Sequence, residues 1–269
     1  MWPLSALTAL TLLFSIGIFS DLHFGWNLNN AGAESLDDAS LGIMNEALGA
    51  GLGMDYVVIN GDLVTGSSDR EILHGTSRDR SVCNRRYEPR QQPSYTRIAD
   101  HKIGGAGGPG NYRVPVYKHK SGTTQALVMW FFDSRGQKPA LGSDANPEIK
   151  DWVDESVARW IKSETKKTDK KWGRAENTGR QAVAFTHIPP HHIRAVSENL
   201  DPVKNPGQNG METTTQDTEK PTRDQPFWDS LNSNVKNLRA VISGHIHGNE
   251  WCAREPTKDG IFCFNKHTG

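Results

Sequence analysis

Aspartate and histidine residues stand directly after apolar, strand-like runs near both ends of this chain. Asp21-Leu22-His23 follows the run Phe14 to Phe19, and Gly244-His245-Ile246-His247 follows the run Ala240 to Ser243. Aspartate and neutral histidine are ligand types that borderline divalent metals select. Ligands this far apart in sequence can share an ion only where the fold brings the ends of their strands together. The pattern therefore restricts the chain to folds in which distant strands end at one place.

The composition fits one domain. The chain has 269 residues, of which 35% are hydrophobic, and this is enough for one large α/β domain with a buried sheet. Lysine plus arginine and aspartate plus glutamate both number 31, so no basic excess indicates nucleic acid as a partner. We expect a single domain over residues 15–269.

Residues 1–20 have two interpretations. The apolar run from Leu4 to Ile18 is similar to the hydrophobic region of a secretory signal, which would direct the protein into the secretory pathway or out of the cell. However, no Lys or Arg precedes the run, and its end supplies the strand before Asp21. The run is too interrupted to predict a membrane span. Both the localisation and the cleavage of this segment are therefore left open.

The three cysteines are too few for a disulfide framework. Cys252 and Cys263 flank a predicted hairpin and could form a disulfide if their Cβ atoms face each other. Cys83 would then be the odd cysteine.

The opening of the chain predicts a βαβ unit. Apolar residues recur at helical spacing over residues 36–48, between strands at Phe14 to Phe19 and Tyr56 to Asn60. This order predicts parallel strands joined by a right-handed crossover. Asp62 follows the second strand as Asp21 follows the first. Because ligands of open α/β sheets bind at the carboxyl ends of strands, we expect the two aspartates to be neighbours.

Two further apolar runs are predicted strands. Ala126 to Phe132 is continuous and apolar, as expected of a strand buried on both faces. Ala182 to Thr186 is a shorter strand that ends at His187. Between them, a stripe of apolar residues from Ile149 to Ile161 predicts a helix.

Four predicted strands thus end in potential ligands, and this convergence is what a two-metal hydrolytic site requires. One carboxylate must bridge both ions, and Asp62 is the candidate. Two cations that share a water lower its pKa enough to supply hydroxide near neutral pH. The six predicted metal ligands are Asp21, His23, Asp62, His187, His245 and His247. The glycines that fit close backbone turns around them are Gly25, Gly61, Gly66, Gly244 and Gly248.

The order of these motifs resembles the calcineurin-like metallophosphoesterases, and especially a fungal subgroup distantly related to purple acid phosphatases. The resemblance spans most of the chain and includes the runs Phe19 to Gly25, Trp130 to Gly136 and His245 to Cys252. It implies an α/β fold of the metallophosphoesterase type, a β-sandwich with flanking helices. It also implies hydrolysis of phosphate monoesters or diesters by a hydroxide that a binuclear metal site activates.

The resemblance implies a role for each ligand. One metal ion would be held by Asp21, His23, Asp62 and His247, and the other by Asp62, His187 and His245. Purple acid phosphatases place a tyrosine three residues after the bridging aspartate, whereas this chain has Thr65. Because that tyrosine is replaced, the resemblance does not single out iron. Manganese, iron and zinc all fit as the two divalent or trivalent ions.

Two departures from the family pattern bear on activity. The family carries a Gly-Asn-His-Asp/Glu block, whose Asn binds the second metal, and no such block follows Gly66. We interpret this as a deletion, for which Asn111 is a poor substitute. The chain also stops at Gly269, where relatives continue, so the sheet is expected to be incomplete at its C-terminal end.

These departures leave a second hypothesis, a catalytically impaired family member that only binds metal or phosphate. In either case the expected partner is a phosphorylated compound. A phosphoprotein, a nucleotide, a phospholipid head group and a small monoester all remain candidates, and the oligomeric state is open.

Other polar residues have both a functional and a structural interpretation. His191 and His192 are the candidates for catalytic contact with the substrate phosphate, and a loop or helix-start role is the alternative. Asp133 and Arg135 either line the site or form a structural ion pair.

Aromatic and turn residues complete this set. Asn249 and Glu250 either orient His247 or only form a turn. Trp152 and Trp160 are expected in the hydrophobic core.

Overall fold

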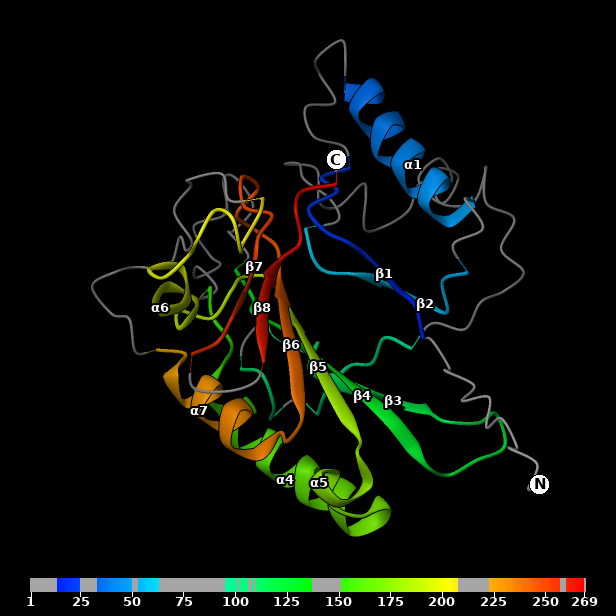
Figure 1. Cartoon of the computed structure of the whole chain (residues 1–269), viewed down its shortest axis with the longest axis vertical. Helices are drawn as coiled ribbons and strands as arrows, with labels where there is room; N and C mark the ends of the chain where they lie inside the picture. The colour runs from blue at the N-terminus through cyan, green and yellow to red at the C-terminus, as the bar shows by residue number, and fades with distance from the viewer. Residues whose placement is uncertain are drawn as a thin grey trace, which may run out of the picture.

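The computed structural model describes residues 14–24, 33–49, 53–62, 95–100, 102–105, 108, 110–136, 151–207, 223–256 and 260–268. These residues form an α/β structure with two sheets (Figure 1). The smaller sheet consists of β1 (Ile16–Phe19) and β2 (Tyr56–Ile59), which are connected through α1 (Ala33–Gly49). β1 and β2 pair in parallel, so the predicted βαβ order at the start of the chain is confirmed.

The larger sheet has six strands in the order β3-β4-β5-β6-β8-β7. These strands are β3 (Tyr112–Tyr117), β4 (Gln125–Phe132), β5 (Gln181–Thr186), β6 (Leu238–Ser243), β7 (Cys252–Arg254) and β8 (Ile261–Phe264). β4, β5, β6 and β8 are parallel, while β3 and β7 pair antiparallel at the two edges. The sheet is therefore mixed, with a parallel centre that places the ends of β5 and β6 side by side.

Helices connect the parallel strands. They are α4 (Glu155–Trp172), α5 (Ala175–Thr178), α6 (Ile193–Ser197) and α7 (Gln225–Asn234). The expected helix from Ile149 begins later, because Asp154 takes the N-cap position and its side chain accepts a hydrogen bond from the backbone N–H of Ser156. Trp152 therefore precedes the helix, and Ile149 lies outside the described residues.

Alternate residues of β4 face two different hydrophobic clusters. Val128, Trp130 and Phe132 pack with residues of α4, α6 and α7, whereas Met129 and Phe131 pack with residues of β1 and β2. The helices thus cover one face of the large sheet, and the small sheet lies on the other (Figure 1). The prediction that this strand is buried on both faces is confirmed.

The two tryptophans expected in the core have different environments. Trp160 packs against the helix-side cluster, as predicted. Trp152 is half-buried, and its ring lies 5.5 Å from the guanidinium carbon of Arg135 and 4.5 Å from that of Arg223. Its role is therefore a cation–π contact with two arginines.

The predicted hairpin and its disulfide are both present. β7 and β8 pair antiparallel, with Cys252 directly opposite Cys263. The two sulfur atoms are bonded, and the two Cα atoms lie 4.1 Å apart. Cys83 lies outside the described residues. In the described part of the chain, no helix is long and apolar enough to span a membrane.

Candidate metal centre

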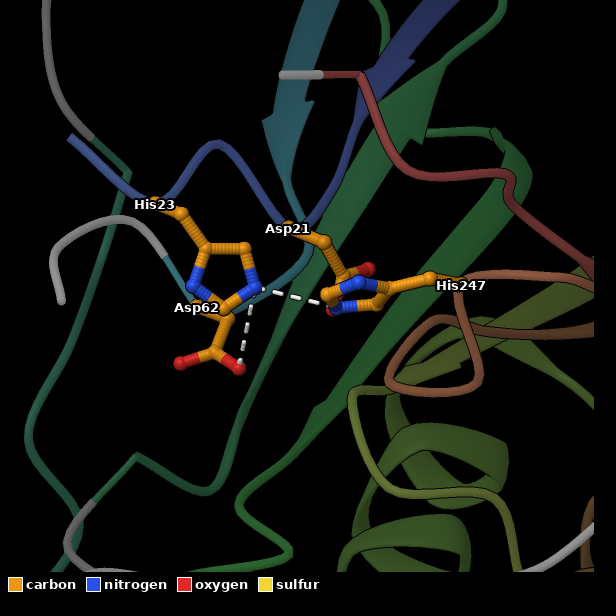
Figure 2. Close-up of side chains that lie close together, drawn as sticks. All are labelled: Asp21, His23, Asp62 and His247. Atoms are coloured by element: carbon orange, nitrogen blue, oxygen red, sulfur yellow. Dashed lines mark hydrogen bonds and ion pairs between the residues drawn. The ribbon is translucent and has the colours of Figure 1, made fainter. Parts of the chain in front are cut away.

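All six predicted ligands lie directly after the carboxyl ends of strands. Asp21 and His23 follow β1, Asp62 follows β2, His187 follows β5, and His245 and His247 follow β6. Because the small sheet packs on the large one, these ends meet at one place. Figure 2 shows Asp21, His23, Asp62 and His247 converging there from separate segments.

The backbone is left-handed at four of these ligands. The φ angle is 53° at Asp21, 49° at His23, 47° at Asp62 and 71° at His245. For residues with a Cβ atom this conformation is strained, and such strain concentrates at functional sites. Main-chain hydrogen bonds hold it in place, since Asp21 N–H donates to Gly61 O at 3.2 Å and His23 N–H donates to Asp62 O at 3.0 Å.

Two of the predicted glycines allow the ligands to approach the backbone. Gly61 has a φ of 90°, and a Cβ atom there would overlap the His187 ring. A Cβ atom at Gly244 would overlap the Ser20 hydroxyl and the Asp21 carboxylate. Glycine is therefore required at both positions.

One group of possible ligands consists of Asp21, His23, Asp62 and His247. The Nε2 atoms of His23 and His247 face each other at 3.0 Å. The Nε2 atom of His247 lies 3.3 Å from Asp21 Oδ1, and that of His23 lies 3.7 Å from Asp62 Oδ2 (Figure 2). Tetrahedral zinc bound by nitrogen and oxygen has ligand atoms about 3.3 Å apart, given bonds of about 2.0–2.1 Å. The spacing in this group fits one such ion.

The other group consists of Asp62, His187 and His245. His187 Nδ1 lies 2.8 Å from the carbonyl oxygen of Asn60, which requires that Nδ1 carry the proton and donate it. The Nε2 atom is then a free lone pair, 3.5 Å from Asp62 Oδ2. It is buried and has no hydrogen-bond partner among the described residues. A buried acceptor of this kind fits a metal ion.

The same carboxylate oxygen serves both groups. Asp62 Oδ2 lies 3.7 Å from the Nε2 atom of His23 in the first group and 3.5 Å from that of His187 in the second. Asp62 therefore has the position of the predicted bridge. The two groups coincide with the ligand sets that the family resemblance implied.

Burial and charge favour the metal-binding form of three of the six ligands. Burial would raise the pKa of Asp62, but the neighbouring His187, together with His23 and His245, outweighs it and holds that pKa below its ordinary value. Burial, together with neighbouring histidines, lowers the pKa of His23 and of His245. Burial would also lower the pKa of His187, but Asp62 and Asp21 outweigh it and raise that pKa. A proton therefore competes for His187 more strongly than for His23 or His245.

A side-chain hydroxyl and a backbone N–H hold the Asp21 carboxylate in place. Its side chain is 1% exposed, and its Oδ2 atom accepts a hydrogen bond from the Ser20 hydroxyl at 2.5 Å. The backbone N–H of His245 donates to both carboxylate oxygens at 3.1 Å. These donors fix the orientation of the carboxylate, as expected of groups that orient a metal ligand.

The two predicted catalytic histidines lie outside both groups. The His192 ring stacks on Trp228, with centroids 4.4 Å apart, and its Nε2 atom is 3.0 Å from Glu255 Oε1. The backbone N–H of His191 donates to Asp224, and its Nε2 atom is buried without a hydrogen-bond partner among the described residues. Contact of either histidine with a phosphate stays a prediction.

Arg135 forms a structural ion pair, as one of its two interpretations predicted, but its partner is not Asp133. Its guanidinium group pairs with Asp154 at 3.3 Å. Asp133 accepts backbone hydrogen bonds from Arg135 and Gly110 instead, so the predicted Asp133–Arg135 pair is wrong. The Asn111 amide donates to Gly108 O and accepts from the Asp133 N–H, which agrees with its being a poor substitute ligand.

The hydrogen bond of Asn249 and the ion pair of Glu250 described here are with residues other than His247. Asn249 is buried and accepts a hydrogen bond from the Trp251 indole at 3.2 Å. Glu250 forms an ion pair with Lys266 at 2.7 Å.

His267 is a residue near the centre that the sequence reasoning did not identify. Its ring stacks on that of His247, with centroids 4.5 Å apart. His267 follows β8 closely, just as the predicted ligands follow β1, β2, β5 and β6. The position of a histidine after a predicted strand is therefore the sequence signal for it.

No protein-family model and no curated protein sequence matches this chain. The resemblance to the metallophosphoesterases thus stays a prediction, while the α/β fold and the two groups of possible metal ligands are features of the structure.

Proposed function

We propose that this protein is a metallophosphoesterase that hydrolyses phosphate esters at a binuclear metal centre. The observation that carries the proposal is the position of Asp62, whose Oδ2 atom lies within 3.7 Å of His23 in one group and 3.5 Å of His187 in the other. A carboxylate shared in this way is the usual element of two-metal hydrolases. The order of the motifs along the chain supports the same reaction.

Metal ions bound there would supply a hydroxide near neutral pH and would neutralise charge on phosphoryl oxygens. The chain's own residues prepare this chemistry. Asp62 would hold both ions, and Asn60 fixes the His187 ring through its carbonyl oxygen. The Ser20 hydroxyl and the His245 N–H hold the Asp21 carboxylate, which would bind the first ion. No residue in this arrangement is required to form a covalent intermediate.

A second candidate function is metal or phosphate binding without turnover. It is favoured by the second group, in which three of the described residues take part. In the family pattern an asparagine completes this shell, and Asn111 is committed to Gly108 and Asp133. Three protein ligands are nevertheless sufficient for catalytic zinc, in which water takes the fourth position.

The test is metal content per chain, measured by elemental analysis on the purified wild-type protein and on Asp62→Asn. Asp38→Asn is the matched control, because Asp38 is exposed on α1. The proposal requires two equivalents in the wild type and in the control, and a loss of both in Asp62→Asn. Hydrolysis of p-nitrophenyl phosphate and of bis-p-nitrophenyl phosphate should follow the same pattern.

The outcomes separate the two functions. Two equivalents of metal without hydrolysis of either ester would favour the binding function. Metal content near zero in the wild type would overturn the proposed hydrolysis and metal binding, and would leave only phosphate binding.

A further inference from the structure

The segment after β8, from Asn265 to Thr268, returns to the candidate metal centre. Asn265 N–H donates to Ser243 O at 2.7 Å, and Thr268 N–H donates to Ser20 O at 3.0 Å. Ser20 N–H donates in turn to the Thr268 hydroxyl oxygen at 3.2 Å. The segment therefore joins the end of β6 to the end of β1, and its trace reaches the blue β1 segment in Figure 1.

His267 is the residue that this segment places against the first group. Its ring lies nearly parallel to that of His247, at an interplanar angle of 22°, and its centroid is 5.9 Å from that of His23. Lys266 holds the segment to the loop after His247 through its ion pair with Glu250. Contacts on both sides of His267 thus fix its position.

His247 is the more exposed of the two histidines in the first group. Its side chain is 37% exposed, compared with 13% for His23. An exposed imidazole has several accessible rotamers, and binding a metal requires that one of them be selected. A ring stacked on it removes that freedom before the metal binds.

We propose that His267 is a positioning residue of the metal centre, which holds the His247 ring so that its Nε2 atom faces Asp21 and His23. This inference rests on the metal centre of the proposed function, but not on phosphate ester hydrolysis. The stacked ring is the part of His267 that acts. Residues that orient metal ligands typically contribute about 10–100-fold to metal affinity.

The experiment is a competition titration of the full, metal-free chain with Zn²⁺ against a chromophoric chelator. His267→Ala should weaken one class of zinc site about 10–100-fold. His247→Ala should weaken the same class, and His245→Ala the other. His267→Phe keeps an aromatic ring and should bind zinc nearly as the wild type does. His119→Ala, at an exposed turn between β3 and β4, is the control.

Each other result overturns the inference. Unchanged zinc affinity in His267→Ala would show that the stacking is irrelevant. A defect in His267→Phe as large as that in His267→Ala would show that a ring nitrogen is needed. Equal weakening of both classes would indicate a general structural role. A wild-type chain that binds no zinc would remove the metal centre itself, and the proposed function with it.

Discussion

The two groups of possible metal ligands share Asp62 but depend on different parts of the fold. Three of the four residues in the first group follow β1 or β2, and only His247 comes from the larger sheet. The second group comes mainly from the larger sheet, since His187 and His245 follow β5 and β6. The first group therefore depends on the packing of the small sheet against the large one. The second is built mainly on adjacent parallel strands.

The groups also differ in how their side chains are oriented. In the first, a hydroxyl group and a backbone N–H fix the Asp21 carboxylate. In the second, a main-chain carbonyl fixes the buried His187 ring. Because different groups orient the two sets of ligands, we expect substitutions to weaken the two sites separately, even though one carboxylate belongs to both.

Removing one histidine from each group has the largest expected effect. His187→Ala should lose the metal of the second group, and His23→Ala that of the first. Each affinity should fall by more than about 100-fold, because a lost ligand costs more than a lost orienting residue. Metal content and zinc titration measure the change. Loss of both metals in both variants would contradict the comparison and show that the two groups bind as a unit.

Replacing Gly61 or Gly244 with alanine should also weaken one group more than the other, but less completely than removing a histidine. Gly61→Ala would displace the His187 ring and weaken the second group, whereas Gly244→Ala would displace Asp21 and weaken the first. We expect each to lower the free energy of unfolding by about 1–3 kcal/mol through overpacking.

Gly42→Ala is the control for these two variants, because a Cβ atom at Gly42 meets nothing within 4 Å. In the helix α1 it should raise stability by up to about 1 kcal/mol. Denaturant unfolding followed by circular dichroism measures all three. A Gly61→Ala protein with normal stability and normal zinc affinity would contradict the close contact between Gly61 and the His187 ring.

Ser20→Ala should act on the first group with a smaller effect. The buried hydroxyl donates to Asp21, and its loss should weaken zinc binding in that group about tenfold. The second group should change less, because its contact with Ser20 is only through the Asn60 carbonyl oxygen. Ser233→Ala on the exposed side of α7 is the control. A larger loss of zinc affinity in the second group than in the first would contradict the assignment of Ser20 to the first group.

Acidification should weaken the second group first. The pKa of His187 is raised, whereas those of His23 and His245 are lowered. Metal can bind His187 only after the proton leaves Nε2, so affinity falls as the pH drops below the raised pKa. The fall should approach about tenfold per pH unit. Zinc titrations between about pH 6 and 8 test this, and an earlier loss from the first group would contradict it.

The central strands and the six ligands could be predicted because their signals are local. Apolar runs such as Ala182 to Thr186 end abruptly at a polar residue, and parallel strands bring such ends together. The edge strand β3 was missed, since it contains Pro115 and is half exposed, as edge strands often are. Its apolar pattern was too weak to distinguish it from a loop.

Other features depend on contacts that sequence spacing does not contain. Arg135 pairs with Asp154, which only the fold brings close. The packing of the small sheet on the large one joins residues of β2 to residues of β4 and β5. The stacking of His267 on His247 likewise depends on the return of the chain to the end of β1.

The left-handed backbone at Asp21, His23, Asp62 and His245 bears on how this chain can evolve. The left-handed conformation alone costs each of these residues about 1 kcal/mol relative to glycine. Selection for backbone conformation alone would therefore favour glycine or asparagine at all four positions. A chain that keeps aspartate and histidine there keeps them against the preference of its own backbone.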